Sequence, residues 1–136
     1  MSTSKQTIAI VSSLLSLLAL SITLGNLASL SAQAVTEVSI VSGASTMGDK
    51  AFSPNPVNIK VGGTITWTNK DSVFHTVTSS TGPNDSSKGK EFDSGLSGPG
   101  ALMTQGKTFS HKFMTAGEFP YFCEPHPAMV GKVIVS

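Results

Sequence analysis

The sequence contains no arginine, and charged residues make up only 12% of it. Lys5 is the only charged residue among the first 34, so subtracting it from nine lysines leaves eight against eight acidic residues in the remainder. Nucleic-acid binding rests on clustered lysine and arginine contacts to phosphates. The composition therefore argues against a nucleic-acid partner and against a strongly charged docking face.

The longest apolar run of the sequence lies at its N-terminus. A Ser-interrupted apolar stretch begins at Ile8, and the small-x-small pattern Ala32-Gln33-Ala34 follows it. This order is typical of a secretory signal peptide, which we predict for residues 1–34. A retained membrane anchor is the alternative, because residues 8–30 are weakly polar and a membrane span needs about 20 residues. Either way, we expect the domain formed by residues 35–136 to lie outside the cytoplasm: secreted, periplasmic or lumenal.

Cys123 is the only cysteine, so the chain cannot form an internal disulfide. In an oxidising compartment cysteines normally occur in pairs, and a single one indicates a metal ligand or a reactive thiol. The 102 residues after the predicted cleavage site fit one small domain with a modest core. We expect this domain to be a monomer, because it is small and electrically neutral.

The predicted domain shows no long amphipathic helix pattern, whereas short strand-like segments recur between turns. These segments cover residues 35–41, 56–61, 64–68, 74–78, 107–113, 118–123 and 132–135. Their spacing predicts an all-β fold, an antiparallel sandwich or barrel with Greek-key connections. Gly62-Gly63 predicts a hairpin between the second and third segments. Two facing sheets would bury the apolar side chains of Ile59, Ile65, Trp67, Phe109, Phe113 and Val133.

Three features lie outside the main pattern. Residues 79–100 are rich in Ser, Gly, Pro, Lys and Asp, which predicts a long solvated connection at the surface. His111 alternates with Phe109 and Phe113, so we expect it to be partly buried beside them in a structural role. Glu124 directly follows Cys123, and strand alternation predicts that its side chain points away from the cysteine into an exposed position.

The most informative motif is Cys123-Glu124-Pro125-His126-Pro127-Ala128-Met129. It spaces a thiol, an imidazole and a thioether three residues apart in a loop that two prolines stiffen. These ligands suit copper far better than magnesium or calcium, and two histidines, a cysteine and a weak axial methionine form blue-copper electron-transfer sites. We expect the second histidine to be His75, 48 residues before the cysteine, because its β-patterned segment can pack beside the loop.

Each of these residues has an ordinary structural interpretation when it is taken alone. Free cysteine is commonly buried, methionine commonly fills cores, and most histidines bind no metal. Zinc is the chief inorganic alternative, but structural zinc sites usually collect four Cys or His ligands and rarely use methionine. The joint pattern predicts one copper ion bound by His75, Cys123, His126 and Met129, and no catalytic residue.

With these motifs in place, residues 35–136 resemble the cupredoxins, and within them the plastocyanin and amicyanin group. The resemblance rests above all on the upstream His75-Thr76-Val77 and on Cys-x-x-His-x-x-Met before a final strand. It implies a Greek-key β-sandwich of about eight strands with one type 1 copper at one end. The short loop resembles that of amicyanin, whereas Glu124 before the proline resembles plastocyanin. Three positions depart from the plastocyanin-like pattern: Phe122 replaces the tyrosine of plant plastocyanins, Phe74 a common proline, and Thr76 an asparagine that often braces the cysteine loop.

The predicted function is the transfer of single electrons between redox protein partners, and not enzymatic catalysis. We expect donor and acceptor to dock near His126, inside an apolar ring formed by Pro127, Ala128, Leu102 and Met103. A copper storage or delivery protein is one alternative, but it would need a Met- or His-rich cluster that the sequence lacks. A redox enzyme for a small molecule such as a nitrogen oxide is another. It would need a second metal or an open copper position, which would arise only if Met129 were displaced.

Overall fold

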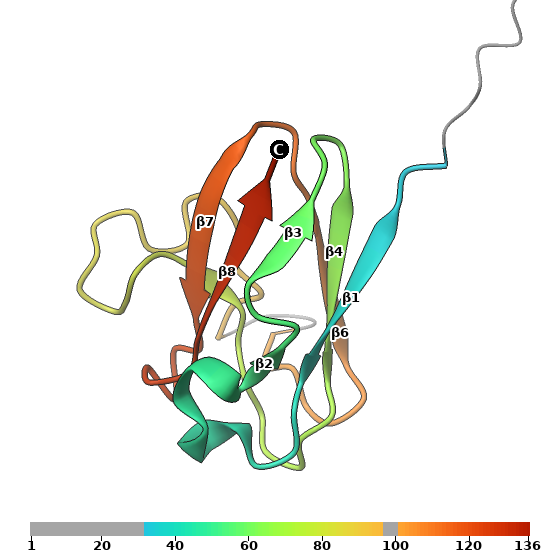
Figure 1. Cartoon of the computed structure of the whole chain (residues 1–136). Coiled ribbons are helices and arrows are strands. Elements are labelled where there is room, and N and C mark those ends of the chain that lie inside the picture. The colour runs from blue at the N-terminus through green and yellow to red at the C-terminus, as the bar shows by residue number, and fades with distance from the viewer. Residues whose placement is uncertain (1–31, 97–100) are drawn as a thin grey trace, which may run out of the picture. The chain divides into compact units, whose positions relative to one another are not determined.

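The computed structural model describes residues 32–96 and 101–136, which form eight strands in two four-stranded sheets (Figure 1). The first sheet, in the order β2-β1-β4-β6, contains β1 (Val35–Ile40), β2 (Phe52–Ser53), β4 (Thr64–Asn69) and β6 (Thr108–Lys112). The second sheet, in the order β3-β8-β7-β5, contains β3 (Val57–Ile59), β5 (Thr78–Ser79), β7 (Gly117–Phe122) and β8 (Val130–Val135). Two 3-10 helices, η1 (Ala44–Thr46) and η2 (Gly48–Lys50), lie between β1 and β2. The predicted all-β sandwich of about eight strands is confirmed.

The core lies between the sheets, because alternate residues of the long strands point inward. In β4, Ile65 and Trp67 are fully buried, while the threonines between them are only partly covered. The Trp67 ring meets Tyr121 of β7 edge-on, with the ring centroids 5.4 Å apart. Five of the six predicted core residues are buried, and Phe109 is partly buried against the same cluster. This aromatic contact between sheets fixes the strands that lead to the site.

The predicted hairpin at Gly62-Gly63 is wrong. The strand before this turn, β3, pairs in parallel with β8, whereas β4 after the turn pairs with β1 and β6 in the other sheet. Gly62 has a φ of 87°, and a Cβ added at Gly63 would lie 2.9 Å from the Lys60 carbonyl oxygen. The glycines therefore permit a tight crossing between the sheets. This crossing lets Ile59 and Ile65 both reach the core.

The predicted strand at residues 74–78 is also wrong for most of its length. Only Thr78 continues into a strand, and β5 pairs with the end of β7. His75 instead forms an isolated antiparallel bridge with Met103. The backbone N–H groups of Thr76 and Val77 donate to side chains, to Cys123 Sγ at 3.4 Å and to Ser94 Oγ at 2.9 Å, so they form no strand ladder.

The connection formed by residues 79–100 is more than a solvated loop in its described part. Phe92 is buried, and its ring centroid lies 5.4 Å from that of Trp67. Ser79 fixes this insertion, because its N–H donates to the Phe92 carbonyl and its hydroxyl accepts the N–H groups of Glu91 and Phe92. The prediction from polar composition is therefore corrected: the connection supplies one aromatic residue to the core.

Residues 1–31, which make up most of the predicted signal peptide or anchor, lie outside the described residues, and so do residues 97–100 of the connection. Within the described residues, no helix is long and apolar enough to cross a membrane.

Candidate metal centre

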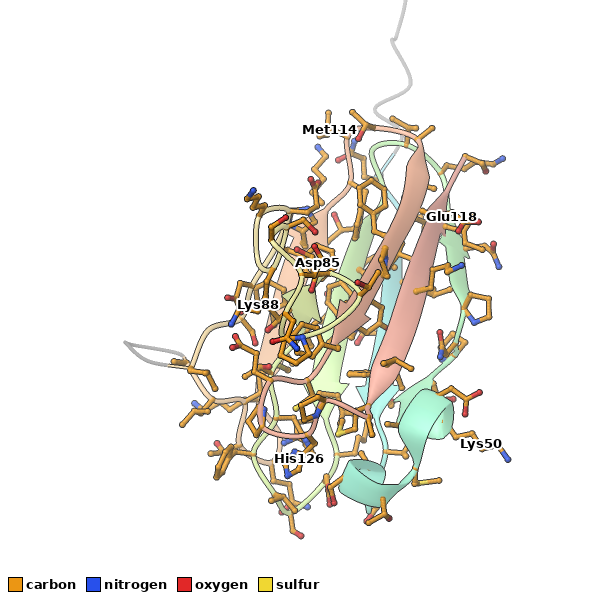
Figure 2. All side chains as sticks on the ribbon, turned by 90° about the vertical axis from the view of Figure 1, so that its left-hand side faces the viewer. Lys50, Asp85, Lys88, Met114, Glu118 and His126 are labelled. Carbon is orange, nitrogen blue, oxygen red and sulfur yellow. The ribbon has the colours of Figure 1, made fainter. Side chains whose placement is uncertain are left out.

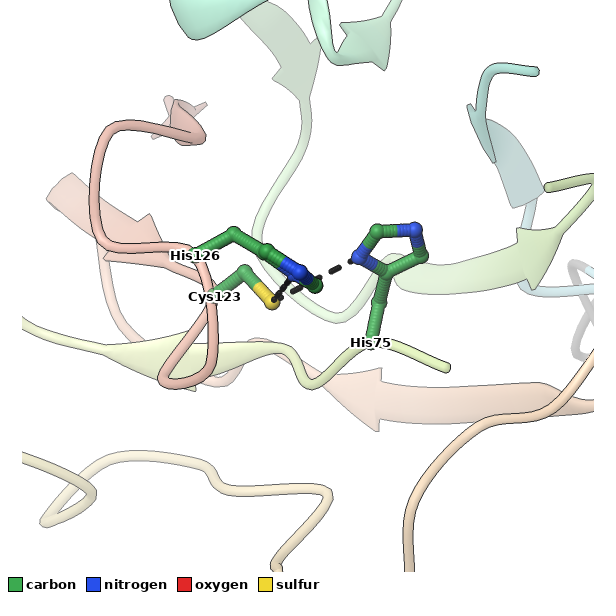
Figure 3. A group of neighbouring side chains, drawn as sticks. All are labelled: His75, Cys123 and His126. Atoms are coloured by element: carbon green, nitrogen blue, oxygen red, sulfur yellow. Dashed lines mark hydrogen bonds between the residues drawn. The ribbon is translucent and has the colours of Figure 1, made fainter. Parts of the chain in front are cut away.

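Three of the four predicted ligands meet at one end of the sandwich (Figures 2 and 3). His75 lies on the connection between β4 and β5, Cys123 directly follows β7, and His126 lies in the loop between β7 and β8. Cys123 Sγ is 3.6 Å from His75 Nδ1 and 3.7 Å from His126 Nδ1. All three ligand atoms lie within 4.8 Å of one another.

These separations fit one metal ion bound by all three side chains. Bond lengths of about 2.1 Å to nitrogen and about 2.3 Å to sulfur, which are usual for zinc, would place sulfur and nitrogen roughly 3.8 Å apart in a trigonal site. The observed separations of 3.6 and 3.7 Å are close to this value. Because the donors are one thiol and two imidazoles, the triangle suits a soft transition metal such as copper.

The loop that carries Cys123, His126 and Met129 is folded by its own backbone. His126 N–H donates to the Cys123 carbonyl at 3.2 Å, and Met129 N–H donates to the His126 carbonyl at 2.9 Å. Cys123 N–H then donates to the Met129 carbonyl at 3.1 Å. Pro125 and Pro127 restrict φ on both sides of the histidine. These turns bring Met129 back beside Cys123, and the methionine side chain is fully buried.

The connection that carries His75 is folded by the buried side chain of Asn69. The Asn69 amide donates to the Val73 carbonyl at 2.7 Å and to the Met103 carbonyl at 2.6 Å. Met103 in turn exchanges two backbone hydrogen bonds with His75, at 3.0 and 3.2 Å. The Asn69 side-chain oxygen accepts the Asp71 N–H at 2.8 Å. One residue at the end of β4 therefore ties down both segments beside the histidine.

A buried carboxylate holds the other side of the His75 ring. Asp71 Oδ2 lies 2.8 Å from His75 Nε2, and Asp71 Oδ1 accepts the N–H groups of Gly43 and Ser72. The hydrogen bond with His75, followed by the one from Gly43, lowers the pKa of Asp71 despite its burial, so the carboxylate is ionised at neutral pH. Sequence reasoning missed Asp71, because Lys70-Asp71-Ser72 has the composition of an exposed turn. Its only signal was a position four residues before the histidine.

Thr76 links the two ligand-bearing segments. Its N–H lies 3.4 Å from Cys123 Sγ, and its hydroxyl oxygen accepts the Glu124 N–H at 2.8 Å. The position where the resemblance leads one to expect asparagine thus braces the cysteine loop with a hydroxyl group.

The predicted exposed position of Glu124 is wrong. Its side chain is only 14% exposed, its carboxylate accepts a hydrogen bond from Lys88 at 3.0 Å, and the Thr78 hydroxyl oxygen lies 3.4 Å from the same carboxylate. Lys88 belongs to the connection formed by residues 79–100. The side chain is covered because this connection folds against the ligand loop.

Burial changes the ionisation of two candidate ligands. It raises the pKa of the Cys123 thiol, so the thiol keeps its proton at neutral pH until a metal displaces it. Burial, followed by the proximity of His75, lowers the pKa of His126. The His126 imidazole is therefore neutral at pH 7 and has a lone pair available for a metal.

His126 is the most accessible residue of the triangle (Figure 2). It is partly exposed, whereas His75 and Cys123 are fully buried. Pro127 and Ala128 are exposed beside it in the chain, as predicted, and Leu102 is partly exposed. The prediction that Met103 belongs to this ring is wrong, because its bridge to His75 directs it into the core, where it is 1% exposed.

Two further apolar residues belong to the same end. Val73 and Phe74 are 39% and 43% exposed and directly precede His75, whose ring centroid lies 5.0 Å from that of His126. His111 lies apart from the triangle on β6. It is partly buried, as predicted, with its ring 4.8 Å from Phe113.

Comparison with known proteins places the chain in one family. Residues 38–136 match the copper-binding proteins of the plastocyanin/azurin family. The chain is 39% identical over 84 residues to amicyanin-alpha of Methylorubrum extorquens, a match that covers 62% of this chain and 63% of the relative. It is 40% identical over 90 residues to the chloroplastic plastocyanin of Tetradesmus obliquus, covering 65% of this chain and 60% of the relative. The chain thus spans less than two thirds of the length of these curated relatives.

Solved structures agree with this placement. A novel purple cupredoxin from Nitrosopumilus maritimus superposes with a TM-score of 0.62 at 32% identity, covering 74% of this chain and 99% of that one. Amicyanin from Paracoccus versutus superposes with a TM-score of 0.53 at 30% identity, covering 75% and 81%. The sandwich and its triangle of ligand atoms define a cupredoxin. The chain belongs to the plastocyanin/azurin family, and copper is its cofactor.

Proposed function

We propose that this protein carries single electrons between redox proteins, using one type 1 copper ion bound by His75, Cys123, His126 and Met129. The observation that carries the proposal is the triangle of Cys123 Sγ and two imidazole Nδ1 atoms, with sides of 3.6 and 3.7 Å at the sulfur. The buried Met129 of the same loop would supply a thioether as the fourth ligand. This ligand set is the one used in blue-copper electron transfer.

Bound copper supplies the one-electron chemistry, and the protein supplies ligands that do not move. Cu(I) and Cu(II) prefer different geometries, so a site that holds its ligands fixed reduces the rearrangement that accompanies each transfer. Here Asn69 and Asp71 fix the His75 segment, while Thr76 ties it to the loop. A set of ligands supported in this way is pre-formed for transfer.

Electrons would enter and leave through His126, the triangle residue with the greatest exposure. Val73, Phe74, Pro127 and Ala128, all exposed, form what we call the apolar end. An uncharged patch lets a partner approach closely and dissociate quickly, as small transient interfaces require. The balance of charges in residues 35–136 also provides little long-range electrostatic steering.

We also propose that the protein works outside the cytoplasm, as a monomer, with protein partners as donor and acceptor. The support is the apolar N-terminal segment with its small-x-small site, together with the formal neutrality of the domain. The chloroplastic plastocyanin relative is consistent with a non-cytoplasmic setting.

The ligand set is tested by the visible and electron paramagnetic resonance spectra of the protein after one equivalent of Cu(II). We expect an intense thiolate-to-copper band with narrow hyperfine splitting, reversible on reduction, absent in Cys123→Ser and retained in the matched control His111→Gln. A weak band typical of nitrogen and oxygen ligation, or a band that survives in Cys123→Ser, would contradict the proposal and favour copper storage. Perturbation of the spectrum by low azide would instead favour the open-site enzyme.

The apolar end is tested by Ala128→Asp, with Val61→Asp as its control. The Ala128 carbonyl lies next to Gly48, so Ala128 is at the η2 end of the sandwich. Val61 is exposed in the β3–β4 turn, which lies at the opposite end (Figure 1). We expect Ala128→Asp to slow electron self-exchange by about tenfold, because two like charges must meet. Nuclear magnetic resonance line broadening in mixed Cu(I) and Cu(II) samples measures this rate. Equal rates in both variants would refute docking through this end.

A further inference from the structure

Asp71 contacts the one nitrogen of His75 that does not face Cys123. Its Oδ2 is 2.8 Å from Nε2, while Nδ1 on the other side of the ring is 3.6 Å from Cys123 Sγ (Figure 3). We propose that Asp71 is a positioning residue that selects the Nε2–H tautomer of His75 and thereby keeps Nδ1 free to bind copper. This inference rests on the proposed function, in which His75 is a ligand.

The tautomer follows from the hydrogen-bonding capacities of the two groups. An ionised carboxylate can only accept hydrogen bonds, so His75 Nε2 must carry the hydrogen in the contact with Asp71. A neutral imidazole has one N–H, which leaves Nδ1 with a lone pair. That lone pair points into the triangle of ligand atoms.

The orientation of the carboxylate is itself fixed. Asp71 Oδ1 accepts the Gly43 N–H at 3.1 Å and the Ser72 N–H at 2.8 Å, so Oδ2 is the oxygen left for the ring. The Asp71 N–H is held by the Asn69 side chain, and both Asp71 and His75 are buried. The two backbone N–H groups therefore hold Oδ1, burial excludes solvent, and Oδ2 faces the histidine ring.

Two consequences follow for bound copper. A carboxylate that accepts from a ligating imidazole makes the ligand more basic, and the loss of such partners typically lowers metal affinity by about 10–100-fold. The greater basicity and the buried negative charge both favour Cu(II) over Cu(I), so Asp71 should lower the reduction potential.

The decisive variant is Asp71→Asn, which keeps the shape of the side chain. The Gly43 and Ser72 N–H groups require an acceptor, so the amide oxygen should take the Oδ1 position and the amide N–H₂ should face His75 Nε2. Nε2 must then accept, and the ring hydrogen moves to Nδ1, where it blocks copper. Asp71→Ala imposes neither tautomer.

We expect ¹⁵N nuclear magnetic resonance of the metal-free protein to show Nε2–H in the parent and Nδ1–H in Asp71→Asn. Copper affinity should fall at least about tenfold in Asp71→Asn and less in Asp71→Ala. A purely structural role predicts the reverse order, because alanine leaves a cavity. In Asp71→Ala the reduction potential should rise by about 59 mV, which for one electron is a tenfold change in the equilibrium between Cu(II) and Cu(I).

Asp85→Asn is the matched control, because Asp85 is partly exposed on the connection 79–100 and bonded to Thr81 and Ser87. If Asp71→Asn keeps Nε2–H and binds copper like this control, the inference is overturned. If the parent shows no thiolate-to-copper band but the tautomer still inverts in Asp71→Asn, the proposed ligand set fails while tautomer selection by Asp71 stands.

Discussion

The two segments that meet at the metal centre are held by different means. On the connection between β4 and β5, His75 is fixed by buried polar side chains, chiefly those of Asn69 and Asp71. In the loop between β7 and β8, Cys123 and His126 are held mainly by backbone turns and flanking prolines. The first histidine is fully buried, and the second is partly exposed.

This difference assigns separate tasks to the two segments of the proposed electron carrier. A buried and fully satisfied polar network is rigid, so it suits the ligand whose orientation and basicity set the properties of the metal. A short loop held by its own backbone does not need Pro127 and Ala128 for packing, so these two exposed residues can form a surface for partners. Among the described residues, His75 has a carboxylate partner and no ion pair involves His126.

The largest expected effect is that of Asn69→Ala, which removes the side chain that holds the His75 segment. It leaves the Val73 carbonyl and the Asp71 N–H without their partner, and the Met103 carbonyl keeps only the His75 N–H. Each buried unsatisfied group costs about 1–3 kcal/mol. We expect the free energy of unfolding to fall by about 3 kcal/mol or more, measured by urea denaturation of the metal-free protein.

Controls from both kinds of region complete this test. Asn58→Ala, at an exposed position of β3, should stay within about 0.5 kcal/mol of the parent. Pro127→Ala in the loop should cost less than about 1 kcal/mol, because it mainly increases the freedom of the unfolded chain. If the proline variant were as unstable as Asn69→Ala, the two segments would not differ in the way described.

The polar network was beyond the reach of sequence reasoning, whereas the loop was not. Cys123, His126 and Met129 are neighbours in sequence, so their spacing alone indicated a shared site. Asp71 bonds to Gly43 across 28 residues and Asn69 bonds to Met103 across 34, and no local pattern reveals such pairs.

The errors in the predicted strands have the same origin. Residues 74–78 alternate like a strand, but the N–H groups of Thr76 and Val77 donate to distant side chains and not to a neighbouring strand. Gly62-Gly63 correctly marked a turn, yet turn residues do not say whether the chain stays in one sheet or crosses to the other. The strands with clear alternation, such as β4, were predicted to within a residue.

Proton release on copper binding tests the ionisation states of Cys123 and His126 in the loop. Burial raises the pKa of Cys123, so the free thiol is protonated, whereas the lowered pKa of His126 leaves that ligand neutral. Between about pH 7.5 and 8.5, above the usual histidine range, Cu(I) affinity should rise about tenfold per pH unit, or 1.36 kcal/mol. The gain levels off once pH exceeds the pKa of the thiol.

Anaerobic competition with a chelator measures this slope, and a weakly buffered titration should count one proton released per Cu(I). A slope near zero would mean that Cys123 is already a thiolate without metal. A slope near two would mean that a second ligand also loses a proton, and the contrast between a neutral His126 and a protonated thiol would fail.

The smallest expected effect concerns Thr76, the residue that joins the two segments. Thr78 donates its hydroxyl hydrogen to the Asp93 carboxylate at 3.0 Å, so the Thr76 hydroxyl donates to Thr78 and accepts the Glu124 N–H. Thr76→Val keeps the shape but removes both bonds, and should cost about 1–2 kcal/mol of unfolding free energy. Thr76→Ser should restore most of it.

The same variant tests whether Thr76 also shapes the cysteine loop. Without the bond to Glu124, the residue after Cys123 can shift, so the thiolate-to-copper band should move in Thr76→Val and return in Thr76→Ser. Thr66→Val, whose exposed hydroxyl bonds to Ser110 on the first sheet, should change neither the band nor the stability by more than about 0.5 kcal/mol. If Thr76→Val lost stability but kept the parent spectrum, the hydroxyl would stabilise the fold without positioning the cysteine. The buried network would then end at His75, and the loop would hold Cys123 by its backbone alone.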